Sequence, residues 1–135
     1  MKVLITGGAG YLGTVLTEEI LNRFPYAKVI VYDNLMYKQD GLFSFFKYPK
    51  DRFEFVYGDV RDKNSLLEQL QKLDKNNDYV IPLAAIVGFP ACARDEKLAT
   101  AVNFEHVKYI VQSTKCRIIY PNTNSGYGVS DGEAH

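Results

Sequence analysis

The sequence predicts an α/β fold: a doubly wound parallel sheet of about five strands with helices on both faces. Short apolar runs rich in β-branched residues alternate along the chain with stretches whose apolar residues recur at helical spacing. Several of the apolar runs lack polar alternation, which is typical of strands that are covered on both faces. Because strands separated by helices are joined by right-handed crossovers, this order favours a parallel sheet over an antiparallel one.

Five segments of the chain are expected to form the strands. They are Lys2–Thr6, Lys28–Tyr32, Phe53–Tyr57, Tyr79–Ile81 and Arg117–Tyr120. Each is short and rich in β-branched or aromatic residues, which favour extended backbone. Pro82 follows the fourth segment, and because proline lacks a backbone N–H we expect that strand to end or to shift its pairing there. If further strands and helices normally cover the last segment, it becomes an exposed sheet edge in this chain, and such an edge tends to pair with another copy or to aggregate. A homodimer is the expected assembly.

Helices are expected in the intervening segments. The first covers Tyr11–Phe24, where leucine, valine and isoleucine recur at helical spacing. The second follows Asp62, a residue suited to cap a helix N-terminus, and carries a stripe of leucines within Leu66–Leu73. The third takes up most of Glu96–Lys115, and a short helix is expected within Asn34–Pro49.

The size and charge of the chain narrow the classes of protein to which it can belong. Its 135 residues, with 47% hydrophobic and 24% charged side chains, are expected to form one domain, 1–135. The 16 basic side chains balance 16 acidic ones, so no net positive field attracts nucleic acid or an anionic membrane. No apolar run approaches the roughly 20 residues of a membrane-spanning helix, and the amino-terminal run is too short for a signal peptide. These observations favour a cytoplasmic protein with no nucleic-acid or membrane partner.

Disulfide and metal chemistry have little support in the composition. Cys92 and Cys116 are too few and too far apart for a disulfide framework or a multi-cysteine zinc site, and both are expected to be free thiols. The histidines are His106 and His135, so no metal site is expected.

A glycine-rich segment, Thr6–Gly13, joins the first strand to the first helix. Its residues Gly8, Gly10 and Gly13 fit the spacing G-x-G-x-x-G. Gly7, Gly10 and Gly13 fit the spacing G-x-x-G-x-x-G as well. Glycines allow a tight turn and remove the Cβ atoms that would keep a pyrophosphate away from backbone N–H groups and the positive end of the helix. A glycine-rich turn alone is weak evidence, but its place between a strand and a helix favours a dinucleotide site.

An aspartate at the end of the second strand supports the same interpretation. Asp33 stands about 20 residues beyond Gly13, where a carboxylate can bond the adenosine ribose diol of a dinucleotide. A carboxylate there would repel a 2′-phosphate and no arginine follows it directly, so NAD is preferred over NADP. The alternative is an aspartate that only bonds or caps its own turn.

These motifs, together with others further along the chain, resemble the extended short-chain dehydrogenase/reductase family. The likeness runs through the whole chain and is to the group of NAD-dependent nucleotide-sugar epimerases and dehydratases similar to UDP-glucose 4-epimerase. Thr6–Gly13 resembles the family's nucleotide loop, Asp33–Leu35 its ribose-binding turn and Gly58–Val60 its adenine-side turn. Leu83–Ala85 matches its fourth-strand motif, and Tyr120–Gly128 resembles its fifth-strand segment.

The resemblance implies a Rossmann-type domain that binds NAD. Its cofactor-binding residues would be Gly7, Gly10, Tyr11, Leu12, Asp33, Asn34, Asp59, Val60, Leu83, Ala84, Ala85 and Asn103. Thr123 falls at the position of the family's catalytic serine or threonine, and it follows a parallel strand at the edge where such sheets bind ligands. Asn103 falls at the position of a helix asparagine that supports the active site. The alternatives are a threonine that bonds its own turn and a simple exposed helix asparagine.

The resemblance also implies a reaction. In this family a hydride leaves a sugar carbon for the nicotinamide, a ketone forms, and epimerisation or dehydration follows before the hydride returns. A Tyr-x-x-x-Lys pair manages the proton, but none of the ten tyrosines here has a lysine four positions later. We therefore expect the chain to be the amino-terminal, cofactor-binding part of a longer enzyme, inactive alone, whose catalytic helix and substrate domain lie beyond His135.

Two other functions stay open at this point. A noncatalytic dinucleotide sensor on the same scaffold would lack the tyrosine by nature. A reductase of the same broad family could act on a nonsugar carbonyl compound, because fold and cofactor do not determine the substrate. The resemblance of Asp33–Leu35 and of the segment around Thr123 favours a nucleotide-sugar substrate.

Overall fold

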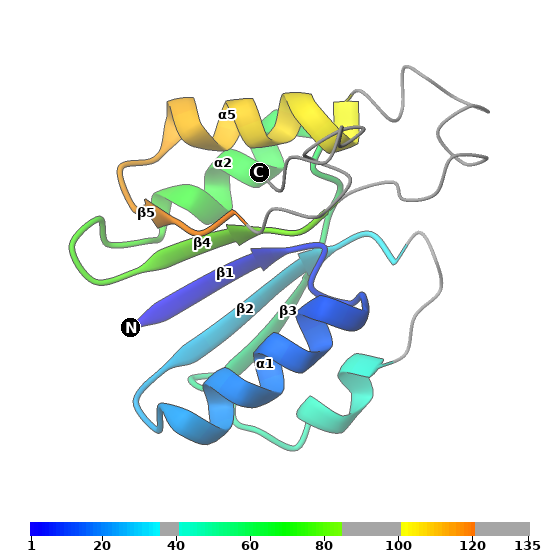
Figure 1. The fold of residues 1–135 in the computed structure, drawn as a ribbon, viewed down its shortest axis with the longest axis vertical. Coiled ribbons are helices and arrows are strands. Elements are labelled where there is room, and N and C mark those ends of the chain that lie inside the picture. The colour runs from blue at the N-terminus through cyan, green and yellow to red at the C-terminus, as the bar shows by residue number, and fades with distance from the viewer. Residues whose placement is uncertain (36–40, 85–100, 121–135) are drawn as a thin grey trace, which may run out of the picture.

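The computed structural model describes residues 1–35, 41–84 and 101–120, and in that part of the chain five parallel strands form one sheet. The strands are β1 (Lys2–Thr6), β2 (Lys28–Asp33), β3 (Phe53–Tyr57), β4 (Tyr79–Pro82) and β5 (Arg117–Ile118). The helices are α1 (Tyr11–Arg23), α2 (Lys63–Gln71) and α5 (His106–Ser113), with a 3-10 helix η1 (Gly41–Phe45) and a π-helical turn η2 (Ala101–Glu105). The order across the sheet is β3-β2-β1-β4-β5 (Figure 1). The predicted α/β class with a parallel sheet is confirmed.

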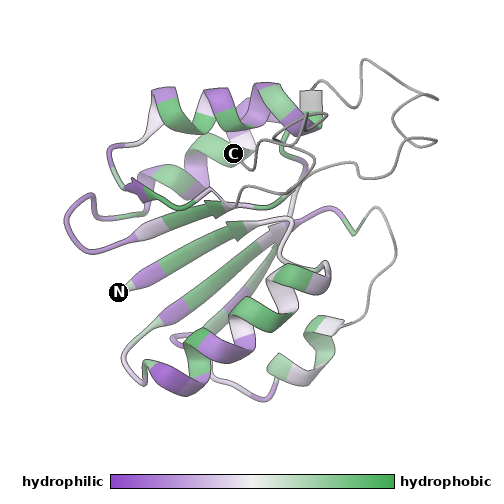
Figure 2. Cartoon of the chain, in the orientation of Figure 1, coloured by the Kyte–Doolittle hydropathy of each residue, from purple (hydrophilic) through white to green (hydrophobic). Residues whose placement is uncertain are grey.

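Helices cover both faces of the sheet. Figure 1 shows α1 and η1 on one face and α2 with α5 on the other. The central strands β1 and β2 are apolar through most of their length (Figure 2). Each strand sends alternate side chains to opposite faces, so a strand buried on both faces has no polar alternation. This burial explains why the strands could be located from short apolar runs.

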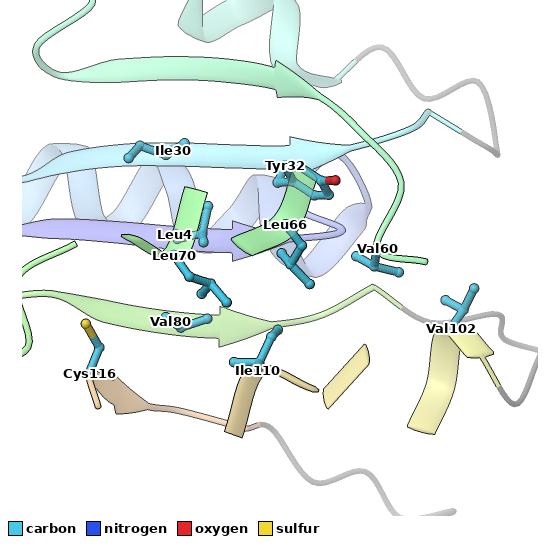
Figure 3. Close-up of a cluster of buried hydrophobic side chains, with 10 residues drawn as sticks. All are labelled: Leu4, Ile30, Tyr32, Val60, Leu66, Leu70, Val80, Val102, Ile110 and Cys116. Atoms are coloured by element: carbon cyan, nitrogen blue, oxygen red, sulfur yellow. The ribbon is translucent and has the colours of Figure 1, made fainter. Parts of the chain in front are cut away.

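Two clusters of buried side chains fill the layers between sheet and helices. The cluster under α2 and α5 contains Leu4, Ile30, Tyr32, Val60, Leu66, Leu70, Val80, Val102, Ile110 and Cys116 (Figure 3). The cluster under α1 and η1 contains Val3, Ile5, Ala9, Leu21, Val29, Val31, Leu42, Phe45, Phe53 and Ile81. Full burial of a Leu, Ile or Val side chain stabilises the fold by about 1.5–3 kcal/mol, so these layers hold the sheet edge in place for the loops that follow.

Pro82 decides where the pairing of β4 with β5 stops. The N–H of Leu83 donates to the carbonyl of Thr6 on the β1 side, and the carbonyl of Val80 accepts from the N–H of Ile119 on the β5 side. Alternation along the strand therefore turns the nitrogen of Pro82 toward β5, where it has no hydrogen to donate. As expected, β4 ends at Pro82, and β5 is shorter than its apolar run because it pairs only at Arg117 and Ile118.

The helix termini follow local chemistry. The carboxylate of Asp62 accepts from the N–H of Ser65 at 3.1 Å, which confirms the predicted cap of α2. The helix expected within Glu96–Lys115 is present from Ala101 onward, first as η2 and then as α5, while residues 96–100 lie outside the described ranges. The short helix expected in Asn34–Pro49 is η1.

Arg52 caps the C-terminus of α1. Its guanidinium donates to the carbonyls of Leu21 at 2.8 Å, Phe24 at 3.1 Å and Ala27 at 2.7 Å. The last carbonyls of a helix have no intrahelical donor, so a cation there satisfies them and also suits the negative end of the helix. Arg52 thereby ties the entry to β3 to the end of α1.

Candidate functional site

The candidate site lies at the carboxyl edge of the sheet. The loops that follow β1, β2, β3 and β4 all leave the sheet at this edge (Figure 1). Because the strands are parallel, the described residues that follow β1, β2, β3 and β4 gather at this edge rather than at opposite ends.

The turn between β1 and α1 needs glycine at two positions for different reasons. Gly7 has φ +70°, and a Cβ there would lie 2.5 Å from the Cα of Ala84. Its N–H donates to the carbonyl of Tyr32 at 2.8 Å, which fixes the turn to the end of β2. At Gly13, a Cβ would lie 2.4 Å from the Cα of Gly8, so the first turn of α1 can rest on the loop only without a side chain.

The N-terminus of α1 presents donors to this edge. Gly10 is the N-cap, makes no side-chain cap, and its carbonyl accepts the first intrahelical bond from Thr14 at 2.9 Å. The N–H groups of Tyr11, Leu12 and Gly13 precede that bond and so have no intrahelical acceptor. Tyr11 is 86% exposed, and the first turn of α1 carries no acidic residue. This arrangement suits a phosphate group.

Asp33 lies beside the glycine turn at the end of β2. Its Oδ2 accepts from the N–H of Ala9 at 2.9 Å, and its Oδ1 accepts from the N–H of Leu35 at 2.7 Å. The carboxylate therefore bonds its own turn, as the alternative interpretation expected, and it also bonds the glycine turn. A carboxylate oxygen can accept more than one hydrogen bond, so both oxygens keep capacity for a hydroxyl donor. A single hydrogen bond therefore joins the Asp33 carboxylate to the glycine turn that leads into α1.

The turn Gly58–Val60, which follows β3, lies next to Asp33 at this edge of the sheet. The carboxylate of Asp59 accepts from the guanidinium of Arg61 at 2.6 Å and from the side-chain amide of Asn34 at 3.4 Å. The hydrogen bond from Arg61 lowers the pKa of Asp59 below its ordinary value, so the group stays ionised at neutral pH. Val60 is buried against the core, and the N–H of Gly58 donates to the carbonyl of Asp33 at 3.1 Å.

The remaining expected site residues divide into described and undescribed ones. Leu83 and Ala84 follow β4 and are half-buried. They lie beside the glycine turn, because the N–H of Leu83 donates to the carbonyl of Thr6 and Ala84 lies against Gly7. Asn103 is half-buried in η2, a π-helical turn of the kind often found at functional sites. Ala85 and Thr123 lie outside the described residues, as do Cys92 and His135. Cys116 is a buried free cysteine.

Two residues at this edge were missed by sequence reasoning. Tyr32 is fully buried, and its hydroxyl donates to the carbonyl of Asp59 at 2.8 Å. His106 is also buried, and its Nε2 lies 3.4 Å from Oγ1 of Thr6. The sequence around each shows only a polar side chain in an apolar or helical pattern. Their hydrogen-bond partners, Asp59 and Thr6, lie in distant segments and could not be identified from it.

Metal and membrane features are absent from the described ranges. Over residues 1–35, 41–84 and 101–120, no three His, Cys, Asp or Glu side chains are grouped so that they could hold a metal ion. In the same ranges, no helix is both long and apolar enough to cross a bilayer.

Comparison with known proteins decides the family. A model described as the NAD dependent epimerase/dehydratase family matches residues 3–134. The chain belongs to this family. The family that the resemblance indicated is thus confirmed.

Curated relatives in the epimerase/dehydratase family are longer proteins. The chain is 31% identical over 133 residues to a CDP-paratose 2-epimerase from Salmonella typhi, an alignment that covers 95% of this chain and 38% of that protein. It is 32% identical over 133 residues to a dTDP-D-glucose 4,6-dehydratase from Dictyostelium discoideum, with 94% of this chain and 30% of that protein covered. The chain thus spans well under half the length of these relatives.

Solved epimerase/dehydratase structures share the fold. A dTDP-glucose 4,6-dehydratase from Streptomyces venezuelae, solved with NAD bound, has a TM-score of 0.82 and 26% identity, covering 100% of this chain and 43% of that one. A UDP-glucose 4-epimerase from Thermus thermophilus, in complex with NAD, has a TM-score of 0.66 and 27% identity, covering 84% and 33%.

Proposed function

We propose that this chain is the NAD-binding part of a nucleotide-sugar epimerase or dehydratase. The observation that carries the proposal is the hydrogen bond from the N–H of Ala9 to the carboxylate of Asp33, 2.9 Å long. It brings together a helix N-terminus free of acidic residues, which suits a pyrophosphate, and a carboxylate that suits a ribose diol. Membership of the epimerase/dehydratase family and relatives named as an epimerase and a dehydratase also support this proposal.

Each part of the edge takes one part of the cofactor in this proposal. The turn with Gly7, Gly10, Tyr11 and Leu12 holds the pyrophosphate. Asp33 and Asn34 would hold the adenosine ribose, Asp59 and Val60 would hold the adenine, and Leu83, Ala84, Ala85 and Asn103 would hold the rest of the cofactor. The carboxylate of Asp33 would meet a 2′-phosphate with a like charge, so we expect NAD to bind in preference to NADP.

The reaction that we propose is transient oxidation of the sugar. When bound, NAD would supply the hydride acceptor for oxidation of a sugar carbon and the hydride donor for its reduction. Thr123 is proposed to contact the reacting hydroxyl. A tyrosine and lysine pair is proposed to take the hydroxyl proton in this reaction. Because none of the ten tyrosines of 1–135 has a lysine four positions later, we propose that 1–135 is inactive alone. A nucleotide sugar is the proposed substrate, and a homodimer the proposed assembly.

Calorimetric titration with NAD and NADP tests the cofactor proposal. Asp33→Asn should weaken NAD binding by about tenfold, the scale of a lost hydrogen bond to a charged group, and should narrow the preference over NADP. Asp78 offers a matched control, because its buried carboxylate also accepts two backbone N–H groups, from Lys2 and Asp74 at 2.7 Å each. Asp78→Asn should lower stability and leave the NAD affinity unchanged.

The same titration can contradict the proposal. Binding of neither dinucleotide by the folded, unmodified protein would overturn it. Equal weakening by Asp33→Asn and Asp78→Asn would show that Asp33 acts only on the fold. For the substrate class, turnover of simple ketones but of no nucleotide sugar by the full-length protein would exclude the proposed substrate.

A further inference from the structure

Tyr32 connects the end of β2 to the turn that follows β3. Its side chain is fully buried on the α2 face, near Val60 and Leu66 (Figure 3). The hydroxyl donates to the main-chain carbonyl of Asp59 at 2.8 Å and lies 3.0 Å from Oγ of Ser65. One phenol therefore contacts both the turn and the first part of α2.

The ring of Tyr32 leaves no room for a side chain at position 58. A Cβ on Gly58 would lie 2.4 Å from two atoms of the ring, so the backbone of Gly58 rests directly on the aromatic face or edge. The N–H of Gly58 meanwhile donates to the carbonyl of Asp33 at 3.1 Å. The start of the turn is thus held by a backbone bond on one side and by the ring on the other.

The rest of the turn is closed by its own side chains. The N–H of Arg61 donates to Oδ1 of Asp59 at 2.8 Å, and its guanidinium pairs with the same carboxylate. These contacts shape the turn internally. Residues at the end of β2 tie the turn to the sheet. They are Tyr32, whose hydroxyl bonds the main chain of Asp59 from 27 residues earlier in the chain, and Asn34, whose side-chain amide bonds the Asp59 carboxylate.

We infer that Tyr32 is a positioning residue for the adenine end of the cofactor, because its hydroxyl and ring hold the turn Gly58–Val60 at the sheet edge. The inference rests on the proposed function, in which this turn lies beside the base. Phenylalanine would fill the same core volume, so what the hydroxyl adds is the bond to the turn. Burial raises the pKa of Tyr32, which keeps the phenol protonated and able to donate at every physiological pH.

The test compares two dinucleotides that differ only in the base. In nicotinamide hypoxanthine dinucleotide, the adenine amino group is replaced by a carbonyl oxygen, so the edge of the base presents reversed donors and acceptors. A correctly placed turn should distinguish this compound from NAD. Tyr32→Phe should weaken NAD by about threefold to tenfold, the scale of one hydrogen bond, and should weaken the hypoxanthine compound less. The preference for NAD should therefore shrink.

Tyr79→Phe is the matched control. The hydroxyl of Tyr79 accepts from the guanidinium of Arg117 at 2.9 Å, at the start of β4 and so at the opposite edge of the sheet. Its removal costs one hydrogen bond without touching the turn, and both affinities should stay as they are. Thermal unfolding of each variant shows whether the fold is kept.

The outcomes separate the inference from the proposed function. If Tyr32→Phe weakens both dinucleotides by the same factor, or neither, Tyr32 is only a core residue and the inference is wrong while NAD binding stands. If the folded, unmodified protein binds neither dinucleotide, the proposed function fails, and the inference fails with it.

Discussion

His106 Nε2 lies 3.4 Å from Thr6 Oγ1, a buried contact between residues 100 positions apart. It joins the end of β1, directly before the glycine turn, to the start of α5. The other ring nitrogen, Nδ1, contacts the carbonyl of Val102, four residues earlier on the same helical segment. A neutral imidazole with its proton on Nδ1 satisfies both contacts, since Nε2 then accepts from the hydroxyl of Thr6.

Burial of His106 makes stability depend on pH. Burial lowers the pKa of His106 below its ordinary value of 6.5. As the pH falls through that value the unfolded chain takes up a proton that the folded chain does not, so the free energy of unfolding should decrease. Urea unfolding between pH 7.5 and pH 5.5 should show the slope, and His106→Gln should remove most of it. The other histidine is His135, and a slope lost in His135→Gln but kept in His106→Gln would contradict the assignment.

Two buried threonines should respond oppositely to loss of the hydroxyl. Thr6 and Thr17 are both fully buried, but over the described ranges Oγ1 of Thr17 has no hydrogen-bond partner, whereas Oγ1 of Thr6 meets His106. Thr17→Val should raise the free energy of unfolding by about 1 kcal/mol, because an unsatisfied buried hydroxyl is removed. Thr6→Val should lower it by about 1–2 kcal/mol, because it leaves the imidazole without its donor. Chemical denaturation of the pair measures both, and equal signs would refute the explanation.

Gly13 should not tolerate alanine, although alanine usually stabilises a helix. A Cβ at Gly13 would lie 2.4 Å from the Cα of Gly8, a backbone atom that cannot move without displacing the turn. We expect Gly13→Ala to lose at least about 2 kcal/mol of stability, against a helix-propensity gain of about 1 kcal/mol, and to weaken NAD binding. Gly41→Ala is the comparison, because the nearest atom there is the side-chain Oγ1 of Thr14 at 3.1 Å. A Gly13→Ala protein as stable as the Gly41→Ala protein would show that the loop adjusts freely.

Much of the fold and part of the candidate site could be predicted because the signals are local. Strands covered on both faces appear as apolar runs, which located all five strands to within two residues of their ends. Asp62 capped α2 as expected, since a cap depends on residues three apart. The glycine spacing and Asp33 were recognisable for the same reason: strand, turn and helix follow one another directly.

Contacts between distant segments could not be predicted in this way. The Tyr32 hydroxyl finds Asp59 and the His106 ring finds Thr6 only after strands and helices have packed, and a pattern of burial does not identify the partner. Asp33 was expected either to bond a ribose or to bond its own turn, and the structure shows that its carboxylate bonds the N–H groups of both Ala9 and Leu35.

The sequence by itself determined the α/β class, the approximate positions of the strands and helices in the described part of the chain, and the glycine turn that starts α1, because each depends on residues that are neighbours in the chain. The tertiary structure alone decided the strand order β3-β2-β1-β4-β5, the early end of β5 opposite Pro82, and the clamping of the Asp59 turn by Tyr32. These depend on which donors and acceptors meet across the packed sheet. Such meetings follow from the simultaneous burial of several segments, which no single stretch of sequence encodes.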